Sequence, residues 1–322
     1  MKITNIRAAI TGALLAVSVF AQAQTWPGQT IKIIVPFTPG TGMDTIARTV
    51  SPKLSERLGQ PVVVQNTPGA SGNIGADNVA KATPDGYTLL MGANTMLMAS
   101  QLYKNVPFNP INDFSAVSMA AYGTLMLVAN PKTGYRSMQD LVAAAKAKPG
   151  SINYGSPGIG TPHHMAMELF KTRTQLFMLH VPYRGTAGYV QDLLSGEINV
   201  GFLPVHVAQG FVSSGKLTAL AVGGNARHPV APNVATFAEL GVKDVNVDMW
   251  YAFFAPNKTP APVVNRLNTE IAAIMSLPEI RAILSRAGLD AASSSTSELN
   301  TTVKNDYERW GSVIKRNGIT AE

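Results

Sequence analysis

The chain has 322 residues, 46% of them hydrophobic and 14% charged, which excludes an intrinsically disordered protein and allows about two or three folded domains. It contains no cysteine, which excludes disulfides, thiolate nucleophiles, zinc ribbons, iron–sulfur ligation and a lipid-modified N-terminal cysteine. The net charge of +7 is a modest surplus that favours anionic partners without specifying them.

Residues 1–23 have the pattern of a cleavable secretory signal. Lys2 and Arg7 supply the positive charge, Ala8–Phe20 is a short apolar run, and Ala21-Gln22-Ala23 matches a cleavage site. The run is shorter than the ~20 apolar residues that a membrane-spanning helix needs, so we expect cleavage and not a membrane anchor. We therefore expect a soluble periplasmic protein without a lipid anchor, with no nucleic-acid partner and no nucleotide cofactor.

Short strand-like runs alternate with helical patterns along the rest of the chain. Several runs are apolar on both faces, which is typical of strands buried between helices in a largely parallel sheet and indicates an α/β fold. The expected strands are Ile31–Phe37, Pro61–Gln65, Tyr87–Met91, Thr124–Asn130, Ser151–Tyr154, Phe177–Val181, Ile198–Phe202, Leu217–Val222 and Met249–Ala255. The helices placed by their apolar spacing are Asp44–Leu58, Ser137–Ala147, Pro262–Met275 and Thr296–Lys315. We expect a kink at Pro52, because an interior proline removes a helix hydrogen bond.

Four glycine-rich segments lie between a predicted strand and a predicted helix. They are Phe37–Asp44, Asn66–Asn73, Tyr154–Pro162 and Tyr183–Thr186. Such a loop directs free backbone N–H groups and the dipole of a helix N-terminus beyond the strand end, which favours an anion there. Glycines also serve tight turns, so each loop alone has a structural explanation; several on one chain favour a functional one.

Nucleotide and enzyme motifs do not fit these loops. The first loop lacks the third glycine of the dinucleotide fingerprint, and no Gly-Lys-Ser/Thr follows it as in a Walker loop. Ser156 lacks the spacing of a nucleophile elbow and has no identifiable base and acid in the sequence. His164 and Glu168 lie four residues apart on one helix face, where a local side-chain pair is a better explanation than a metal site. We expect no catalytic residue, no metal and no cofactor.

Motifs in both halves of the chain follow one order. The first half contains Trp26-Pro27, Ile33-Ile34-Val35-Pro36-Phe37-x-Pro39-Gly40-x-x-x-Asp44-x-x-Ala47-Arg48, Leu58-Gly59-Gln60-Pro61, Gly69-Ala70-x-Gly72-x-Ile74-Gly75 and Pro84-Asp85-Gly86-Tyr87. The second half contains Tyr154-Gly155-Ser156, Gly160-Thr161, His164, Glu168-Leu169-Phe170-Lys171, His180-Val181-Pro182-Tyr183-x-Gly185, Asp192-Leu193-Leu194-x-Gly196 and Trp250-Tyr251. This order closely resembles the Bug family, also called the TctC family, the substrate-binding proteins of tripartite tricarboxylate transporters. The resemblance covers essentially the whole chain after residue 23.

The resemblance implies a two-lobed periplasmic-binding-protein fold of type II, each lobe a mixed, mostly parallel sheet flanked by helices, with two crossover segments as a hinge. The expected lobes are residues 24–123 with 248–322, and residues 124–247. It also implies a monomeric receptor, not an enzyme, that closes around a small carboxylate and delivers it to the membrane subunits of a tripartite tricarboxylate transporter. A ligand-sensing receptor that signals through a sensor kinase is the alternative.

The resemblance further implies that the first and third glycine-rich loops hold the ligand's carboxylates from opposite lobes. The expected ligand-binding residues are Phe37, Thr38, Gly40, Thr41, Asn94, Ser156, Gly158, Thr161, His164, Tyr183, Arg184, Phe202 and His206. Thr41 departs from the family pattern, in which a second glycine usually follows Gly40, and its hydroxyl and methyl groups could alter the loop.

The charges expected near the cleft favour a dianion. Asp44 is the only acid there, whereas potential donors are Arg184, His163, His164 and His206. An α-ammonium group would lack a carboxylate partner, and an unpaired buried charge is costly, which disfavours amino-acid ligands. Apolar side chains such as Phe37 and Met43 would surround the middle of the ligand. We therefore expect an aromatic dicarboxylate such as terephthalate, with uptake of an aliphatic di- or tricarboxylate as the alternative.

Overall fold

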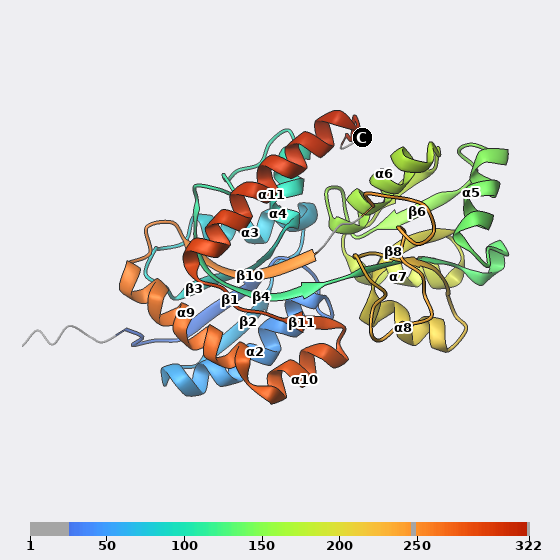
Figure 1. The fold of residues 1–322 in the computed structure, drawn as a ribbon. Coiled ribbons are helices and arrows are strands. Elements are labelled where there is room, and N and C mark those ends of the chain that lie inside the picture. Colours follow the sequence, from blue (N-terminus) through green and yellow to red (C-terminus); the bar gives the residue numbers. More distant parts are fainter. Residues whose placement is uncertain (1–25, 246–248, 321–322) are drawn as a thin grey trace, which may run out of the picture.

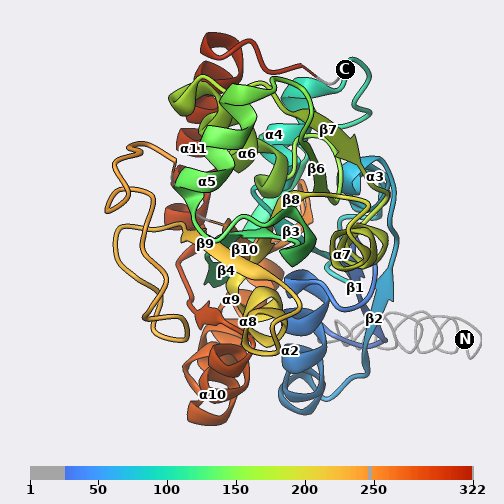
Figure 2. The ribbon, with the colours of Figure 1, turned by 90° about the vertical axis from the view of Figure 1, so that its right-hand side faces the viewer.

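The protein folds into two lobes that lie side by side (Figure 1). The structure is a computed structural model that describes residues 26–245 and 249–320. The predicted signal, residues 1–23, lies outside the described residues, as does the predicted lobe boundary at 247/248. Figure 2 views the second lobe end on, with the first lobe behind it.

The first lobe is built on a six-stranded sheet with the order β11-β4-β10-β3-β1-β2. Its strands are β1 (Ile31–Val35), β2 (Val62–Asn66), β3 (Thr88–Ala93), β4 (Phe114–Gly123), β10 (Met249–Pro256) and β11 (Leu289–Ala291). Its helices are α2 (Gly42–Leu58), α3 (Asn73–Ala80), α4 (Thr95–Leu102), α9 (Ala261–Ser276), α10 (Pro278–Arg286) and α11 (Thr296–Arg316), with the short 3₁₀ helix η1 (Ala70–Gly72). Strands β1, β2 and β3 are parallel, and β10 runs antiparallel between β3 and β4.

The second lobe is built on a five-stranded sheet with the order β7-β6-β8-β5-β9. Its strands are β5 (Leu125–Ala129), β6 (Asn153–Ser156), β7 (Leu179–Pro182), β8 (Val200–Pro204) and β9 (Thr218–Val222). Its helices are α5 (Met138–Ala147), α6 (Pro162–Thr174), α7 (Thr186–Ser195) and α8 (Val205–Ser213), with the 3₁₀ helix η2 (Pro131–Thr133). Here β5 is the antiparallel strand, between β8 and β9. Each lobe is therefore a mixed sheet flanked by helices, and the expected α/β two-lobed fold class is confirmed. Among the described strands, two of the five pairings in the first sheet and two of the four in the second are parallel.

Each sheet is covered by helices on both faces because its strands are apolar on both faces. In the first lobe Ile33 packs on the side of α2 and α9, whereas its neighbour Ile34 packs on the side of α3, α4 and α11. In the second lobe Leu127 and Val128 alternate in the same way, with α5 and α6 on one face and α7 and α8 on the other. Side chains of successive strand residues point to opposite faces, so one strand contributes to two cores.

The four helices predicted from apolar spacing are present, and side-chain caps explain where α2, α5 and α11 begin. Ser137 caps α5 and Ser295 caps α11, each in a capping box with an acidic residue three positions later. Helix α2 continues through Pro52 as a single helix, so the expected kink does not interrupt it. Strands β4 and β11 are additional to the predicted set; β4 is rich in alanine and serine, which have weaker strand preference than the branched residues of β1.

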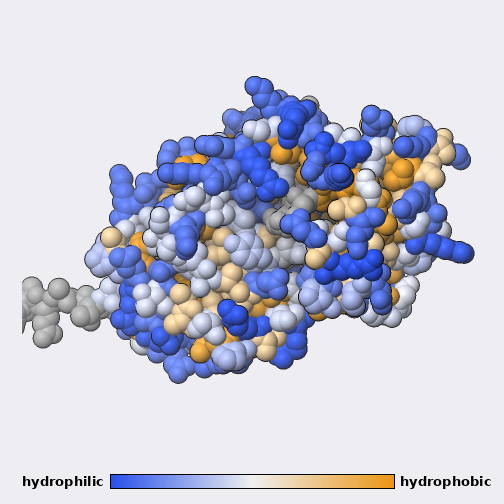
Figure 3. All heavy atoms as spheres, viewed as in Figure 1, coloured by the Kyte–Doolittle hydropathy of each residue, from blue (hydrophilic) through white to orange (hydrophobic). Residues whose placement is uncertain are grey.

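The chain crosses from the first lobe to the second where β4 ends at Gly123 and β5 begins at Leu125. The predicted lobe boundary between residues 123 and 124 lies at this connection and stays a prediction. The chain returns to the first lobe before β10. On the face shown in Figure 3, hydrophilic residues cover most of the surface, and apolar residues reach it in patches, mainly on the second lobe.

Candidate functional site

A pocket lies between the two lobes, at the carboxyl ends of parallel strands from both sheets. The first lobe contributes the loops after β1 and β3 and the start of β10; the second contributes the loops after β6, β7 and β8. The lining residues are Phe37, Gly40, Thr41, Gly42, Met43, Ala93, Asn94, Thr95, Pro157, Thr161, Pro162, His163, Thr186, Pro204, His206, Val207, Met249 and Tyr251. Ligands of α/β proteins bind at this edge of a sheet, so the pocket is the candidate ligand site.

Within the described residues, five helices begin at the wall of this pocket: α2 and α4 from the first lobe, and α6, α7 and α8 from the second. The first N–H groups of a helix have no partner inside the helix, and the helix dipole places about half a positive charge at that end. None of the described residues that line the pocket is Asp, Glu, Lys or Arg. The positive potential of the pocket therefore comes from backbone groups and not from charged side chains, which suits an anion.

The first of these helices, α2, is held at its start by Thr41 and Asp44. The Thr41 hydroxyl accepts a hydrogen bond from the Asp44 N–H at 3.3 Å, and the Asp44 carboxylate accepts one from the Gly40 N–H at 3.0 Å. The Asp44 carboxylate also accepts bonds from Arg48 and Asn66, each at 2.9 Å. Burial raises the pKa of Asp44, but these hydrogen bonds outweigh it and hold the pKa below its ordinary value. Asp44 thus holds the loop in place, and its negative charge is already paired with Arg48.

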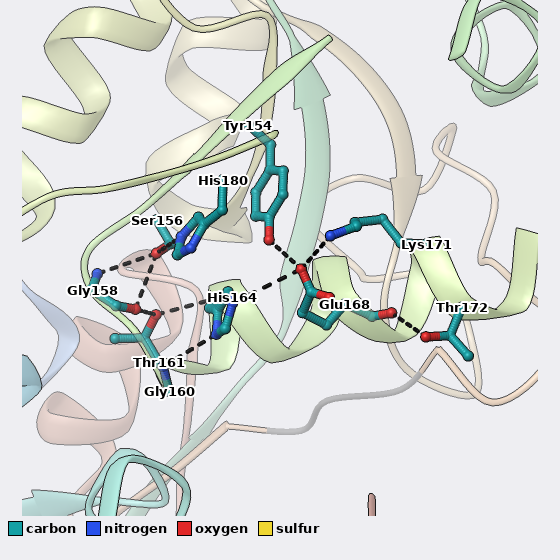
Figure 4. A network of polar contacts seen from close by, with 10 residues as sticks. All are labelled: Tyr154, Ser156, Gly158, Gly160, Thr161, His164, Glu168, Lys171, Thr172 and His180. Carbon is teal, nitrogen blue, oxygen red and sulfur yellow. Dashed lines mark hydrogen bonds and ion pairs between the residues drawn. The ribbon is translucent and has the colours of Figure 1, made fainter. Parts of the chain in front are cut away.

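The loop between β6 and α6 is held by a second polar cluster, shown in Figure 4. The Thr161 hydroxyl donates to the Gly158 carbonyl at 2.7 Å and, as the N-cap of α6, accepts from the His164 N–H. The Ser156 hydroxyl lies 2.7 Å from Nε2 of His180 and also bonds to the Gly158 backbone. Ser156 is fully buried and does not line the pocket. It therefore supports the loop from behind.

Behind this loop lies a stack of three aromatic rings. The rings of Tyr154 and His180 are 4.7 Å apart and those of His180 and His164 are 4.3 Å apart, nearly parallel in both cases. Glu168 closes the cluster, because it accepts hydrogen bonds from Tyr154 and from Lys171. Burial, together with the charge of Lys171, lowers the pKa of His164 to about 3. Burial, with His164 as its neighbour, also lowers the pKa of His180 to about 3, so both rings are neutral at pH 7.

The structure brings some of the predicted residues together and places others apart. The predicted residues that line the pocket are Phe37, Gly40, Thr41, Asn94, Thr161 and His206. Gly158, Tyr183 and Arg184 line a second hollow at the rim between the lobes, which also includes Ser71 and Tyr103 of the first lobe.

Four predicted residues line neither hollow: Thr38, Ser156, His164 and Phe202. Thr38 lies against Gly185 of the other lobe, and the Ser156 and His164 side chains belong to the cluster behind the loop. Phe202 packs on Phe237 in the core of the second lobe, because its side chain points from the face of β8 into that core and not toward the pocket at the strand end. These four side chains therefore line neither hollow, and the predicted role of each in ligand binding stays a prediction.

The pocket also contains residues that were not singled out from the sequence, among them Met249 and Tyr251 at the start of β10 and Ala93 at the end of β3. The pairing of β10 with β3 places Tyr251 opposite Ala93. The aromatic pair Trp250-Tyr251 is the only sequence feature that marks this segment. The sequence does not show that β10 runs antiparallel between β3 and β4, which is what brings Tyr251 to the pocket.

The described part of the chain contains no group of three or more His, Cys, Asp or Glu side chains placed to hold a metal ion. No helix between residues 26 and 320, outside 246–248, is both long enough and apolar enough to cross a membrane. Two lobes joined around a pocket lined by helix N-termini define a solute-binding protein.

Comparison with known proteins identifies the family. The TctC family model, described as tripartite tricarboxylate transporter family receptor, matches residues 46–319, and the chain belongs to this family. A UPF0065 protein of Bordetella pertussis is 35% identical over 315 residues, which covers 98% of this chain and 97% of that protein. Protein BugT of the same organism is 33% identical over 323 residues and covers 99% of both chains. The expected resemblance is thereby confirmed.

Solved structures agree with this assignment. The structure of Rpa4515 from R. palustris with adipate superposes with a TM-score of 0.88 at 32% identity, covering 92% of this chain and 99% of that chain. MatC (Rpa3494) from Rhodopseudomonas palustris with bound malate has a TM-score of 0.84 at 27% identity, covering 90% of this chain and all of that chain. The chain is thus similar over most of its length to proteins whose structures hold small carboxylates.

Proposed function

We propose that the chain, exported by residues 1–23, is a periplasmic receptor for a dicarboxylate with an apolar body, and that terephthalate is the first ligand to test. The observation that carries this proposal is the pocket wall, where helices begin and no described lining residue is charged. Helix N-termini neutralise a carboxylate without a fixed cation. The receptor delivers its ligand to the membrane subunits of a tripartite tricarboxylate transporter.

Two anionic ends and an apolar middle follow from how the two lobes face the pocket. Helices α2 and α4 begin on one side, and α6, α7 and α8 begin on the other, so each lobe offers N–H groups to one carboxylate. Phe37, Met43, Met249 and Tyr251 form an apolar part of the wall. Burial raises the pKa of the Tyr251 phenol, which therefore stays neutral and acts as an aromatic surface.

An aliphatic dicarboxylate is the second candidate, and the relatives favour it. Rpa4515 was solved with adipate, which has carboxylates at both ends of an unbranched apolar chain. MatC was solved with malate, whose hydroxyl needs an additional polar partner. The apolar part of the wall, formed by residues such as Phe37, Met43 and Met249, suits the unbranched chain of adipate or the ring of terephthalate.

The mechanism of capture that we propose is closure of the lobes around the ligand. A ligand that contacts both lobes at once binds the closed arrangement more tightly than the open one, and so shifts the population toward it. The membrane subunits can then distinguish the loaded receptor by its closed shape. No covalent step is required.

A thermal-shift panel tests the proposal. It should contain mono-, di- and tricarboxylates, aromatic and aliphatic, with amino acids as the comparison. A ligand at 100 times its Kd stabilises the folded state by about 2.7 kcal/mol, which raises the melting temperature by a few degrees for a chain of this size. We expect terephthalate or adipate to raise the melting temperature. A shift with amino acids and none with any dicarboxylate would contradict the proposal.

A further inference from the structure

Two histidines of the second lobe form part of the pocket wall. His163 is the second residue of α6, and His206 is the second residue of α8. Both line the pocket. The two rings are near enough that His206 lowers the pKa of His163. These are the only titratable groups of the second lobe among the pocket-lining residues described.

The hydrogen-bonding state of these rings points to a ligand. The His163 residue is only 8% exposed, yet neither of its ring nitrogens has a hydrogen-bond partner among the described residues. Nδ1 of His206 is also buried there without a partner. Buried polar groups in folded proteins are nearly always hydrogen-bonded to protein or to ordered water, so these atoms on the wall of one pocket are positions where a bound ligand group can supply the partner.

The position of the His163 ring is fixed from behind. It packs edge-on against Tyr189, with ring centroids 6.4 Å apart and an interplanar angle of 81°. Tyr189 is itself fixed, because its hydroxyl donates to the Phe202 carbonyl at 2.7 Å. A ring held in this way cannot readily turn to find another partner in the protein.

The groups around the pair leave both rings neutral until an anion binds. Burial, and then the neighbouring His206, lowers the pKa of His163 to about 3. Burial, and then the neighbouring His228, lowers the pKa of His206 to about 4. Tyr189 and Tyr251 are neutral because burial raises their pKa values. Burial lowers the pKa of His228, and the charge of Asp290 partly opposes this. No described residue that lines the pocket carries a carboxylate to stabilise an imidazolium.

A bound carboxylate changes this balance. An opposite charge within ~4–6 Å favours the protonated imidazole and raises its pKa by about 1–3 units. A neutral imidazole has one N–H to donate, whereas the protonated ring has two, and bonds between charged groups are the stronger ones. Proton uptake therefore improves the match between the histidine pair and an anion.

We propose that His163 and His206 contact one anionic group of the ligand, and that this group binds together with a proton taken up by the pair. The inference rests on the proposed dicarboxylate function. Because the complex then holds more protons than the free receptor, ligand affinity rises as the pH falls. The pair also selects against ligands that present a cationic group at this end of the pocket.

Calorimetric titration tests this proposal with terephthalate and adipate as probes. The titrations are run at pH 6.0, 7.0 and 8.0, each in two buffers with different enthalpies of ionisation. Simple carboxylic acids have pKa values of about 4–5, so the free probes carry nearly constant charge over this range. We expect Kd to be lower at pH 6.0 than at pH 8.0, by about twofold if the anion raises the pKa of His206 by two units and by about tenfold if it raises it by three. The binding enthalpy should differ between the buffers in the direction of net proton uptake.

Variants of the two histidines test whether they take up the proton. His163→Gln and His206→Gln should each weaken binding about fivefold or more and reduce the pH dependence. A Kd independent of pH, with equal enthalpies in both buffers, would overturn the proton coupling and leave the proposed function intact. Binding of no dicarboxylate at any pH would overturn the proposed function and this inference with it. The two-buffer comparison uses the unmodified protein, so it decides the question even where a variant fails to fold.

Discussion

Gly160 of the second lobe lies so close to Ala99 of the first that a Cβ on Gly160 would stand 2.7 Å from the Ala99 Cα. Gly158 approaches Ser71 in the same way, since a Cβ on Gly158 would collide with the Ser71 hydroxyl oxygen. Both glycines belong to the loop between β6 and α6, beside the candidate ligand site. The lobes therefore meet at the pocket through backbone that carries no side chain.

Gly160→Ala should lower ligand affinity by separating the lobes. The added methyl group would collide with the Ala99 backbone, which cannot move aside as a flexible side chain can. Gly134→Ala is the matched control: its φ of +76° is close to the +74° of Gly160, but a Cβ there meets nothing within 4 Å. Both variants should lose about 1–2 kcal/mol of stability from the left-handed backbone. Only Gly160→Ala should weaken adipate or terephthalate binding, by about tenfold, in calorimetric titration. Equal affinities of the two variants would contradict the role given to this contact.

Thr161→Val should loosen the loop that lines the pocket. It removes the N-cap of α6 and the bond to the Gly158 carbonyl while it keeps the shape of the side chain. Loss of a cap costs about 1 kcal/mol of unfolding free energy, which urea denaturation measures. Ser137→Ala removes the cap of α5 in the same lobe, away from the pocket. A similar loss of stability in both, with weaker ligand binding only in Thr161→Val, is the expected result; unchanged binding in Thr161→Val would place the ligand elsewhere.

Asp44→Asn should destabilise the first lobe by about 1–3 kcal/mol at pH 7, because it breaks a buried carboxylate network. The pKa of Asp44 is lower in the folded protein than its ordinary value of 3.8. Its contribution is therefore fully present above about pH 4 and is lost as the pH falls through the folded pKa. Urea denaturation of both proteins at pH 7 and at pH 3 measures this. The difference should shrink at pH 3; a constant difference would show that the charge of Asp44 is not what matters.

The unliganded receptor should become less stable as the pH falls from 7 to 5. Burial lowers the pKa values of His163, His164 and His180 to about 3 and that of His206 to about 4. The unfolded chain binds these protons near pH 6.5, so between that pH and the folded pKa values it holds more protons than the folded state. Each such histidine then removes about 1.4 kcal/mol of stability per pH unit. Equal urea midpoints at pH 7.5 and pH 5.0 would contradict this account of the buried rings.

Much of the fold could be predicted from local patterns. Apolar spacing, with the caps of α5 and α11 and the first-turn proline of α9, determines those helices largely on their own. Their predicted bounds agree with the structure within about two residues. Strand β4 was harder to predict, because its alanines and serines have weak strand preference and the strand depends on its pairing with β10. Sheet order depends on contacts between distant parts of the chain, and the family resemblance supplied what the local pattern could not.

The candidate site was predictable in its loops and less so in its individual side chains. Glycines and N-caps mark the strand-to-helix corners, and the predicted residues Gly40, Thr41 and Thr161 line the pocket in the structure. The direction in which a side chain points from such a loop depends on its tertiary neighbours. The Ser156 hydroxyl bonds to His180, and the Phe202 ring packs in the core. His163 was recognised only as one of several donors, because its unpartnered nitrogens are visible only in the folded protein.

The central claim is that the pocket binds a dicarboxylate through both lobes. Calorimetric titration of terephthalate into the receptor, first unfolded in denaturant, freed of carried-over ligand and refolded, tests it most directly. The account predicts saturable binding with one site per chain, competition by adipate, and a heat-capacity decrease from burial of the apolar body. Saturable binding of an amino acid, with no heat from terephthalate or adipate at millimolar concentration, would contradict it.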